Sequence, residues 1–176
     1  MICGVHHVAI HALDIERTRR FYEEAFGFRH AMPNYLEWQD NSDIDRTIRV
    51  EGSAARMLMM SAGNCYLELF EFKKPEPPEK DPLRANDRGN THIAFAVANL
   101  ESEMHRLKAI GMTFVSEMPQ SNRWLRAVYG RDPDGNLIEL IEVAEHMSFA
   151  FEKVPLLGSN AAADQTSRNL EQPYEL

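Results

Sequence analysis

Apolar and polar residues follow the same order of patterns twice along this chain. Each copy opens with a short run that places a histidine before apolar residues, first at residues 5–10 (VHHVAI) and again at residues 90–95 (NTHIAF). A stretch with apolar residues at helical spacing follows each run. Each copy then closes with a β-rich run of apolar residues that contains two glutamates, which is typical of a strand. The patterns therefore predict two units of strand, helix and further strands.

Both predicted helices carry residues that favour a helix start and a helix stop. In the first copy, Asp14 is placed as the N-cap and Gly27 as the stop. In the second copy, Asn99 and Gly111 take the same places. The apolar face is formed in the first helix by Ile15, Thr18, Phe21, Tyr22 and Ala25, and in the second by Leu100, Met104 and Leu107. Because these residues recur at helical spacing, they predict two amphipathic helices.

The closing segments of the two copies also match. A Gly-Asn turn precedes the run YLELFEF at residues 66–72 and the run LIELIEV at residues 137–143. Glu68 and Glu139 fall at the same place in these β-rich runs. Two matching ends in the same order, separated by a helix, indicate an internal duplication.

The duplication divides the chain into four parts. We place the first module at residues 4–72, a proline-rich, charged linker at 73–88, the second module at 89–143 and a C-terminal extension at 144–176. The two modules together are expected to form one domain. From Gly158 onward the composition is typical of a weakly ordered tail.

The first module contains a polar stretch that the second module lacks. This stretch lies within residues 33–55 and runs from Trp38 through Asp45. We expect a loop there, which could serve as a lid over the site.

Composition and charge argue against several classes of protein. The net charge of −8 at pH 7 and the scattered arginines argue against a nucleic-acid partner, which needs clustered basic residues. No apolar stretch approaches the ~20 residues that span a bilayer, and the N-terminal residues MICGVHH do not form a signal peptide. Cys3 and Cys65 are too few for a disulfide framework, so we interpret both as reduced thiols. We therefore expect a cytoplasmic protein that binds neither nucleic acid nor membrane.

The matched histidines and glutamates form a candidate metal site. Side chains alternate faces along a strand, so Glu68 can face a concave interior while Glu71 faces solvent. The same holds for Glu139 and Glu142. A pseudo-twofold axis between the modules would bring two histidines and two glutamates to one point: His7, Glu68, His92 and Glu139.

Taken singly, such a histidine or glutamate is more often an ordinary core or surface residue than a ligand. The equivalent placement in both modules is what supports the set. Two carboxylates in one cavity repel each other unless a cation lies between them, and a divalent ion balances both charges. Imidazole nitrogen with carboxylate oxygen suits Zn, Fe(II), Ni, Co or Mn, whereas Ca and Mg prefer oxygen alone. The pattern predicts one divalent transition metal.

The chain resembles the vicinal oxygen chelate superfamily, which includes glyoxalase I, extradiol dioxygenases and bleomycin-resistance proteins. Four segments carry the resemblance: HHVAIHALDIERTRRFYEEAFGF, GNCYLELFEF, GNTHIAFAV and RDPDGNLIELIEV. The resemblance implies an α+β fold in which two βαβββ modules form an open, barrel-like mixed sheet around a metal. It places the ligands at the same four residues, and it leaves out His6, whose strand parity is wrong.

The resemblance also implies the chemistry. In this superfamily a metal chelates two neighbouring oxygens of a substrate and stabilises the charge that develops as the reaction proceeds. Glu139 and Glu68 are then the expected catalytic bases. His11, which shares strand parity with His7, and Arg126 and Tyr129, which precede the last turn, are the candidate contacts to a small-molecule substrate.

Counting coordination positions separates the possible reactions. Four protein ligands on an octahedral ion leave two open positions, which favours a lyase or isomerase that binds a bidentate substrate. A ring-cleaving Fe(II) extradiol dioxygenase needs about three open positions and would use only His7, His92 and Glu139. A third alternative is a non-catalytic small-molecule binder of the resistance type, and the complete ligand set argues against it.

Two further expectations concern the substrate and the assembly. His11 and Phe72 stand where glyoxalase I carries the Arg and Asn that bind glutathione, so glutathione is not the expected substrate. The exposed edges of the predicted sheet and the aromatic stretch after residue 143 favour a homodimer. The residues of that stretch expected to dock on a neighbouring surface are Phe149, Phe151 and Leu156.

Overall fold

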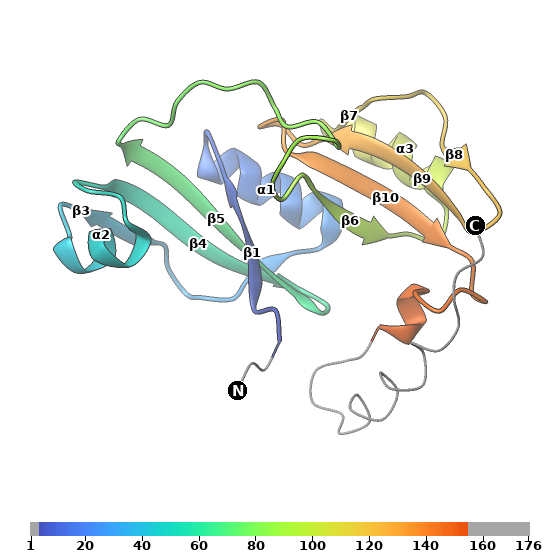
Figure 1. Ribbon diagram of the computed structural model, residues 1–176, viewed down its shortest axis with the longest axis horizontal. Coiled ribbons are helices and arrows are strands. Elements are labelled where there is room, and N and C mark those ends of the chain that lie inside the picture. The colour runs from blue at the N-terminus through green and yellow to red at the C-terminus, as the bar shows by residue number, and fades with distance from the viewer. Residues whose placement is uncertain (1–3, 155–176) are drawn as a thin grey trace.

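The chain folds into two open mixed sheets that lie next to each other (Figure 1). The computed structural model describes residues 4–154. The first module contains, in chain order, β1 (His7–His11), α1 (Ile15–Phe26), β2 (Arg29–His30), β3 (Leu36–Gln39), α2 (Ser42–Ile48), β4 (Ala54–Ala62) and β5 (Cys65–Lys74). The second module contains β6 (His92–Ala96), α3 (Leu100–Ala109), β7 (Thr113–Phe114), β8 (Gln120–Ser121), β9 (Leu125–Arg131) and β10 (Leu137–Val143), and the 3-10 turn η1 (Phe151–Lys153) follows.

Both sheets have the same strand order and the same strand directions. The first sheet has the order β1-β5-β4-β2, with β3 also paired to β4, and the second has the order β6-β10-β9-β7, with β8 paired to β9. The first strand of each module runs parallel to its last strand, and the other pairs are antiparallel. The predicted α+β fold with two βαβββ modules is therefore confirmed.

The two long helices begin where the sequence predicts. The Asp14 side chain accepts hydrogen bonds from the backbone of Glu16 and Arg17 at the start of α1, and Gly27 ends the helix in the left-handed conformation. The Asn99 side chain caps α3 in the same way. All five residues predicted for the apolar face of α1 are buried. Within residues 4–154, no helix is long and apolar enough to cross a membrane.

The prediction of a loop at the polar stretch from Trp38 through Asp45 is wrong. Residues 36–39 form β3, which pairs with β4, and residues 42–48 form the short helix α2. The Asn41 side chain caps α2, and Asp45 accepts hydrogen bonds from the backbone of Gly52 and Ser53. Local capping of this kind is not visible in hydrophobic periodicity, because the segment has few apolar residues to set a period.

The C-terminal extension is only partly covered by the structure. Phe149 and Phe151 lie at its start with 50% and 54% of their surface exposed. Leu156 and the tail predicted from Gly158 onward lie outside the described residues. The expected docking of this segment stays a prediction.

The two modules share one hydrophobic core on the side where the helices lie. The Phe26 ring of α1 stacks on the Phe95 ring of β6 with centroids 3.8 Å apart. Arg106 of α3 donates hydrogen bonds to the backbone carbonyl oxygens of Glu24 and Ala25 near the end of α1. These contacts join the helix of one module to elements of the other, so the modules are held side by side.

A polar turn of the second module is also tied to α1. The buried carboxylate of Asp132 accepts hydrogen bonds from the backbone of Asp134 and Asn136 at 2.9 Å and from the hydroxyl of Tyr22 at 3.1 Å. Asp134 in turn accepts hydrogen bonds from Arg17 and Thr18 of α1. The motif that the sequence shows as RDPDGN is therefore a structural joint between the modules.

Burial sets the ionisation of this joint. It raises the pKa of Asp132, against the hydrogen bonds from Asn136, and the nearby charge of Asp134 raises that pKa further. Burial also raises the pKa of Tyr22 well above its ordinary value, and the charge of Asp132 adds to this effect. Tyr22 therefore acts as a neutral donor.

Removing the Asp132 carboxylate should destabilise the whole protein. Asp132→Ala leaves buried donors without an acceptor, so we expect the free energy of unfolding to fall by about 2–4 kcal/mol in urea denaturation. The matched control is Asp81→Ala, because Asp81 is exposed. We expect that change to stay within about 0.5 kcal/mol. Equal effects of the two substitutions would contradict the joint.

The raised pKa of Asp132 predicts a distinct pH dependence. Because the folded state holds this proton more tightly than the unfolded state, the carboxyl group contributes stability that is present at low pH and lost as the pH rises through its folded pKa. Asp132→Asn removes this titration. Between about pH 4 and pH 7, the stability of the unmodified protein should therefore fall relative to that of Asp132→Asn. Parallel pH profiles from chemical denaturation would refute this assignment.

Candidate metal centre

The first predicted ligand pair forms where β1 runs beside β5. The register places Ala9 opposite Glu68, so His7, Ala9 and Glu68 share one face of the sheet. The Nε2 atom of His7 lies 3.1 Å from the Oε2 atom of Glu68. The Glu68 side chain is only 13% exposed.

The second module repeats this arrangement where β6 runs beside β10. Ala94 lies opposite Glu139, and the Nε2 atom of His92 lies 3.2 Å from the Oε2 atom of Glu139. The Glu139 side chain is also 13% exposed. The equivalence inferred from the repeat is therefore present in three dimensions, down to the small alanine that leaves space beside each carboxylate.

Glu71 and Glu142 point away from the predicted ligands, as strand parity predicts, but the expectation that they face solvent is wrong, because they lie on the helix side and are only 21% and 20% exposed. Glu71 lies 3.6 Å from the guanidinium of Arg56. Glu142 accepts a hydrogen bond from Arg126 at 2.9 Å and another from the backbone of Leu100 at the start of α3. The glutamates on the helix side are therefore neutralised by arginines, whereas Glu68 and Glu139 lie beside imidazoles and have no arginine or lysine partner among the described residues.

Each ligand histidine is also held at its second nitrogen. The Nδ1 atom of His92 lies 3.0 Å from the Thr91 hydroxyl. The Nδ1 atom of His7 lies 2.9 Å from Nδ1 of His6, whose ring stacks on Tyr66. The preceding residue thus orients each imidazole so that Nε2 points at the glutamate. Sequence reasoning set His6 aside as a ligand and missed this orienting contact, although its adjacency to His7 was a usable signal.

The two carboxylates have different neighbours across the sheet. Tyr129 of β9 lies opposite Glu139, and its ring packs edge-on against His92 at 5.3 Å. Burial raises the pKa of Tyr129, and the charge of Glu139 and a hydrogen bond to it act in the same direction. The residue opposite Glu68 is Met59, which offers no hydroxyl. The residue opposite Glu139 therefore offers a hydroxyl, whereas the residue opposite Glu68 does not.

The other two predicted substrate contacts occupy different positions. His11 lies on the same face as His7, near the ring of Phe72, and its Nε2 atom is buried without a hydrogen-bond partner. Burial lowers the pKa of His11, against the charges of Asp134 and Glu71. Arg126 lies on the helix side, where it bonds Glu142 and Glu101. It is therefore wrongly placed to meet a substrate held beside Glu139.

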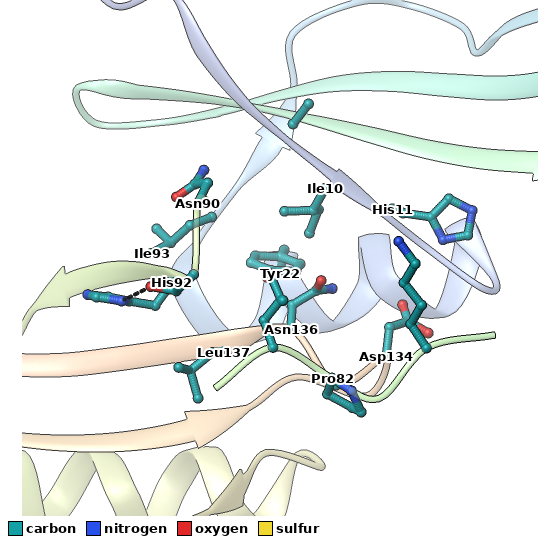
Figure 2. A pocket seen from close by; sticks show the side chains of 15 residues that line it. Ile10, His11, Tyr22, Pro82, Asn90, His92, Ile93, Asp134, Asn136 and Leu137 are labelled. Atoms are coloured by element: carbon teal, nitrogen blue, oxygen red, sulfur yellow. Dashed lines mark hydrogen bonds between the residues drawn. The ribbon is translucent and has the colours of Figure 1, made fainter. Parts of the chain in front are cut away.

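A cavity of about 270 Å³ lies between the modules, beside the second pair (Figure 2). His92, His11, Tyr22 and Asn136 are among the residues that line it. Figure 2 shows that its walls come from β1, α1, β6 and the turn before β10. Space is thus present at the seam next to a predicted ligand.

Within one chain, the four predicted ligands do not meet at a single point. Among residues 4–154, no group of three or more His, Cys, Asp or Glu side chains is arranged to hold a metal ion. The expected meeting of both modules at a single point inside the chain is therefore not found. The reason is the packing: the modules meet at their helices and edges and lie side by side, so their ligand faces do not oppose each other (Figure 1). Each chain presents two separate His–Glu pairs.

A family model places this chain among known proteins. The Glyoxalase/Bleomycin resistance protein/Dioxygenase superfamily matches residues 4–140. The chain belongs to this superfamily. This result agrees with the resemblance inferred from the sequence. The matched residues include both His–Glu pairs.

Individual members of the superfamily share about a third or less of their residues with this chain. The 2-epi-5-epi-valiolone epimerase of Actinomyces sp is 31% identical over 152 residues, which span 80% of this chain and 79% of the epimerase. A glyoxalase family protein from Bacillus cereus has the same fold, with a TM-score of 0.69, 23% identity, and coverage of 81% of this chain and 95% of that protein. The fosfomycin resistance protein FosX from Listeria monocytogenes, solved with Mn(II) and sulfate, has a TM-score of 0.52 at 22% identity, over 82% and 96% of the chains.

Proposed function

We propose that this protein is a metal-dependent lyase or isomerase of the glyoxalase type. It acts on a small molecule that is bound through two neighbouring oxygens. Its metal centre is completed between two copies of the chain. The observation that carries the proposal is the pair of equivalent His–Glu contacts, one in each module, at 3.1 and 3.2 Å.

The chemistry of each pair fits a divalent transition metal. Two ligand atoms that bind one ion at about 2.1 Å, at right angles to each other, lie about 3.0 Å apart. The observed contacts are close to this spacing. Each glutamate is mostly buried and faces no arginine or lysine among residues 4–154, so a cation would supply the missing charge. Nitrogen and oxygen donors together suit Zn, Ni, Co, Mn or Fe, and the Mn(II) in FosX agrees with this range.

A second copy of the chain is the natural source of the other two ligands. Among residues 4–154, no helix covers the faces that carry the pairs, and Ala9 and Ala94 beside them are exposed (Figure 1). In a dimer with twofold symmetry, a contact between the first pair of one copy and the second pair of the other occurs twice. Two complete centres with four ligands each result. This arrangement keeps the ligand set predicted from the sequence and explains why one chain alone does not assemble it.

The metal, when bound, would polarise the two substrate oxygens and lower the cost of charge developing on them. His6 and Thr91 would fix the orientation of the two imidazoles. Tyr129 would hold Glu139 in place, whereas the Oε1 atom of Glu68 has no hydrogen-bond partner among the described residues. Glu68 is therefore the better candidate to accept a proton next to a carbonyl at Oε1, with Glu139 as the more rigid carboxylate.

The same geometry weighs against a dioxygenase. A ring-cleaving enzyme would need Glu68 off the metal, so that His7, His92 and Glu139 leave three positions open. The contact of Glu68 with His7 matches that of Glu139 with His92 to within 0.1 Å. This equality supports a four-ligand centre, which on an octahedral ion would leave two positions open for the substrate.

The shared centre can be tested by mixing two inactive variants. His7→Ala and His92→Ala should each lose tight metal binding as homodimers. When the two variants are co-expressed, a mixed dimer carries one damaged and one intact centre, so about one quarter of the tight sites should return. Metal content per chain and sedimentation mass measure the result. If each centre lies within one chain, no tight sites return, and a mass equal to one chain would refute the dimer.

The position of the Tyr129 hydroxyl beside Glu139 gives a second prediction. Tyr129→Phe deletes only the hydroxyl, and we expect metal affinity to fall about tenfold in competition with a chelator, because partners that orient ligands contribute this much. Tyr66→Phe is the matched control, since Tyr66 lies opposite His7 and the substitution keeps the ring that stacks on His6. Equal metal affinities in both variants would show that the hydroxyl does not position Glu139.

A further inference from the structure

An aromatic cluster lies on the ligand face of the first module. It consists of Trp38, Phe70, Phe72 and His11. The ring centroids of Trp38 lie 6.2 and 6.0 Å from those of Phe70 and Phe72, and Phe70 and Phe72 are 5.6 Å apart. His11 lies nearly parallel to Phe72 at 6.3 Å. The second module has no counterpart in its register, because Ile141 and Val143 occupy the positions of Phe70 and Phe72.

The aromatic cluster is a direct continuation of the first His–Glu pair. Phe70 and Phe72 follow Glu68 by two and four residues on β5, so all three side chains share a face. At about 3.3 Å per residue, the two rings lie roughly 7 and 13 Å along the strand from the carboxylate. His11 stands at the same end of β1, four residues after His7. A molecule of modest length can therefore touch both the metal ligands and the rings.

The surroundings of the aromatic cluster are apolar. The residues that share this face on the neighbouring strand β4 are Ala55, Met57 and Met59. Arg56 and Glu71 lie on the other side of the sheet and pair with each other. None of these positions gives a charged substrate group a partner of opposite sign.

The rings of the aromatic cluster are held in place but not fully covered. The indole nitrogen of Trp38 donates a hydrogen bond of 2.7 Å to the hydroxyl of Ser53, which itself donates to Asp45. Trp38 is buried, whereas Phe70 and Phe72 are only partly buried. A rigid, partly open aromatic surface loses little conformational freedom when a ligand binds it.

We propose that the aromatic cluster binds a flat, apolar group of the substrate while the metal centre holds its two neighbouring oxygens. This inference rests on the proposed function and narrows the substrate class. The substrate is a vicinal-oxygen compound with an uncharged, preferably aromatic, group about 7–13 Å from the chelated oxygens. The β3–α2 segment, which supplies Trp38 and its anchor Asp45, is then part of the substrate site and sets its specificity.

Three hydroxamates with the same chelating group test this proposal on the metal-loaded protein. Acetohydroxamate carries only a methyl group, 6-phenylhexanohydroxamate carries a phenyl ring on a chain long enough to reach the aromatic cluster, and suberic monohydroxamate carries a carboxylate on a chain of similar length. Calorimetry should show the phenyl compound binding about tenfold tighter than acetohydroxamate, and the carboxylate compound binding no tighter. In Phe70→Leu/Phe72→Leu the phenyl preference should fall at least about fivefold, with acetohydroxamate affinity unchanged. Phe114→Leu, at a partly buried ring outside the aromatic cluster, should keep the full preference.

A spectroscopic measurement tests the same inference without replacing Phe70 or Phe72. The chain has two tryptophans, so Trp124→Phe leaves Trp38 as the single reporter. The phenyl hydroxamate should change Trp38 fluorescence, and acetohydroxamate should not. Equal affinities of the phenyl and methyl compounds, or an unchanged Trp38 signal, would overturn the inference while leaving the metal centre intact. If acetohydroxamate itself fails to bind in a metal-dependent way, the proposed function is wrong instead.

Discussion

The parallel register between the first and last strand of each module is the constraint on which the rest depends. Because Ala9 lies opposite Glu68 and Ala94 lies opposite Glu139, each glutamate shares a face with the histidine that opens its module. A shift of one residue would turn Glu68 or Glu139 toward the helix side. It would also turn the arginine-paired Glu71 or Glu142 toward the opposite face. Parallel neighbours need a crossover, and α1 and α3 provide it while covering the opposite faces. One choice of register therefore separates the face that carries the His–Glu pairs from the face that packs against the helices.

How the two modules meet decides what one chain can do. Stacking of Phe26 on Phe95 and the contacts of Arg106 with the end of α1 fix the modules side by side. This packing leaves both ligand faces open and keeps the pairs apart. The duplication thus produces two half-centres per chain, and the function that we propose depends on association. The unequal environments of Glu68 and Glu139 show that the halves have also diverged within this common plan.

Periodicity and the internal repeat predicted most of the fold. The caps of α1, the face that it buries and the order of strand, helix and strands in each module all follow from residue patterns in the sequence. The pairing of each histidine with its glutamate was predictable too, because strand parity fixes it. The arrangement between modules was not, since it depends on packing across a seam that no periodicity encodes. Arg126 and Tyr129 are three residues apart on β9 and therefore lie on opposite faces, so only Tyr129 falls on the side of Glu139.

The joint at Asp132 makes the two modules depend on each other. Two copies of a βαβββ unit can in principle part again and survive as separate gene products. Here Tyr22 of the first half completes a buried turn of the second, and Asp134 of the second holds Arg17 and Thr18 of the first. Either half alone would expose apolar rings and leave polar groups without partners. Each module therefore depends on the other for a fully satisfied core, which favours keeping both in one chain.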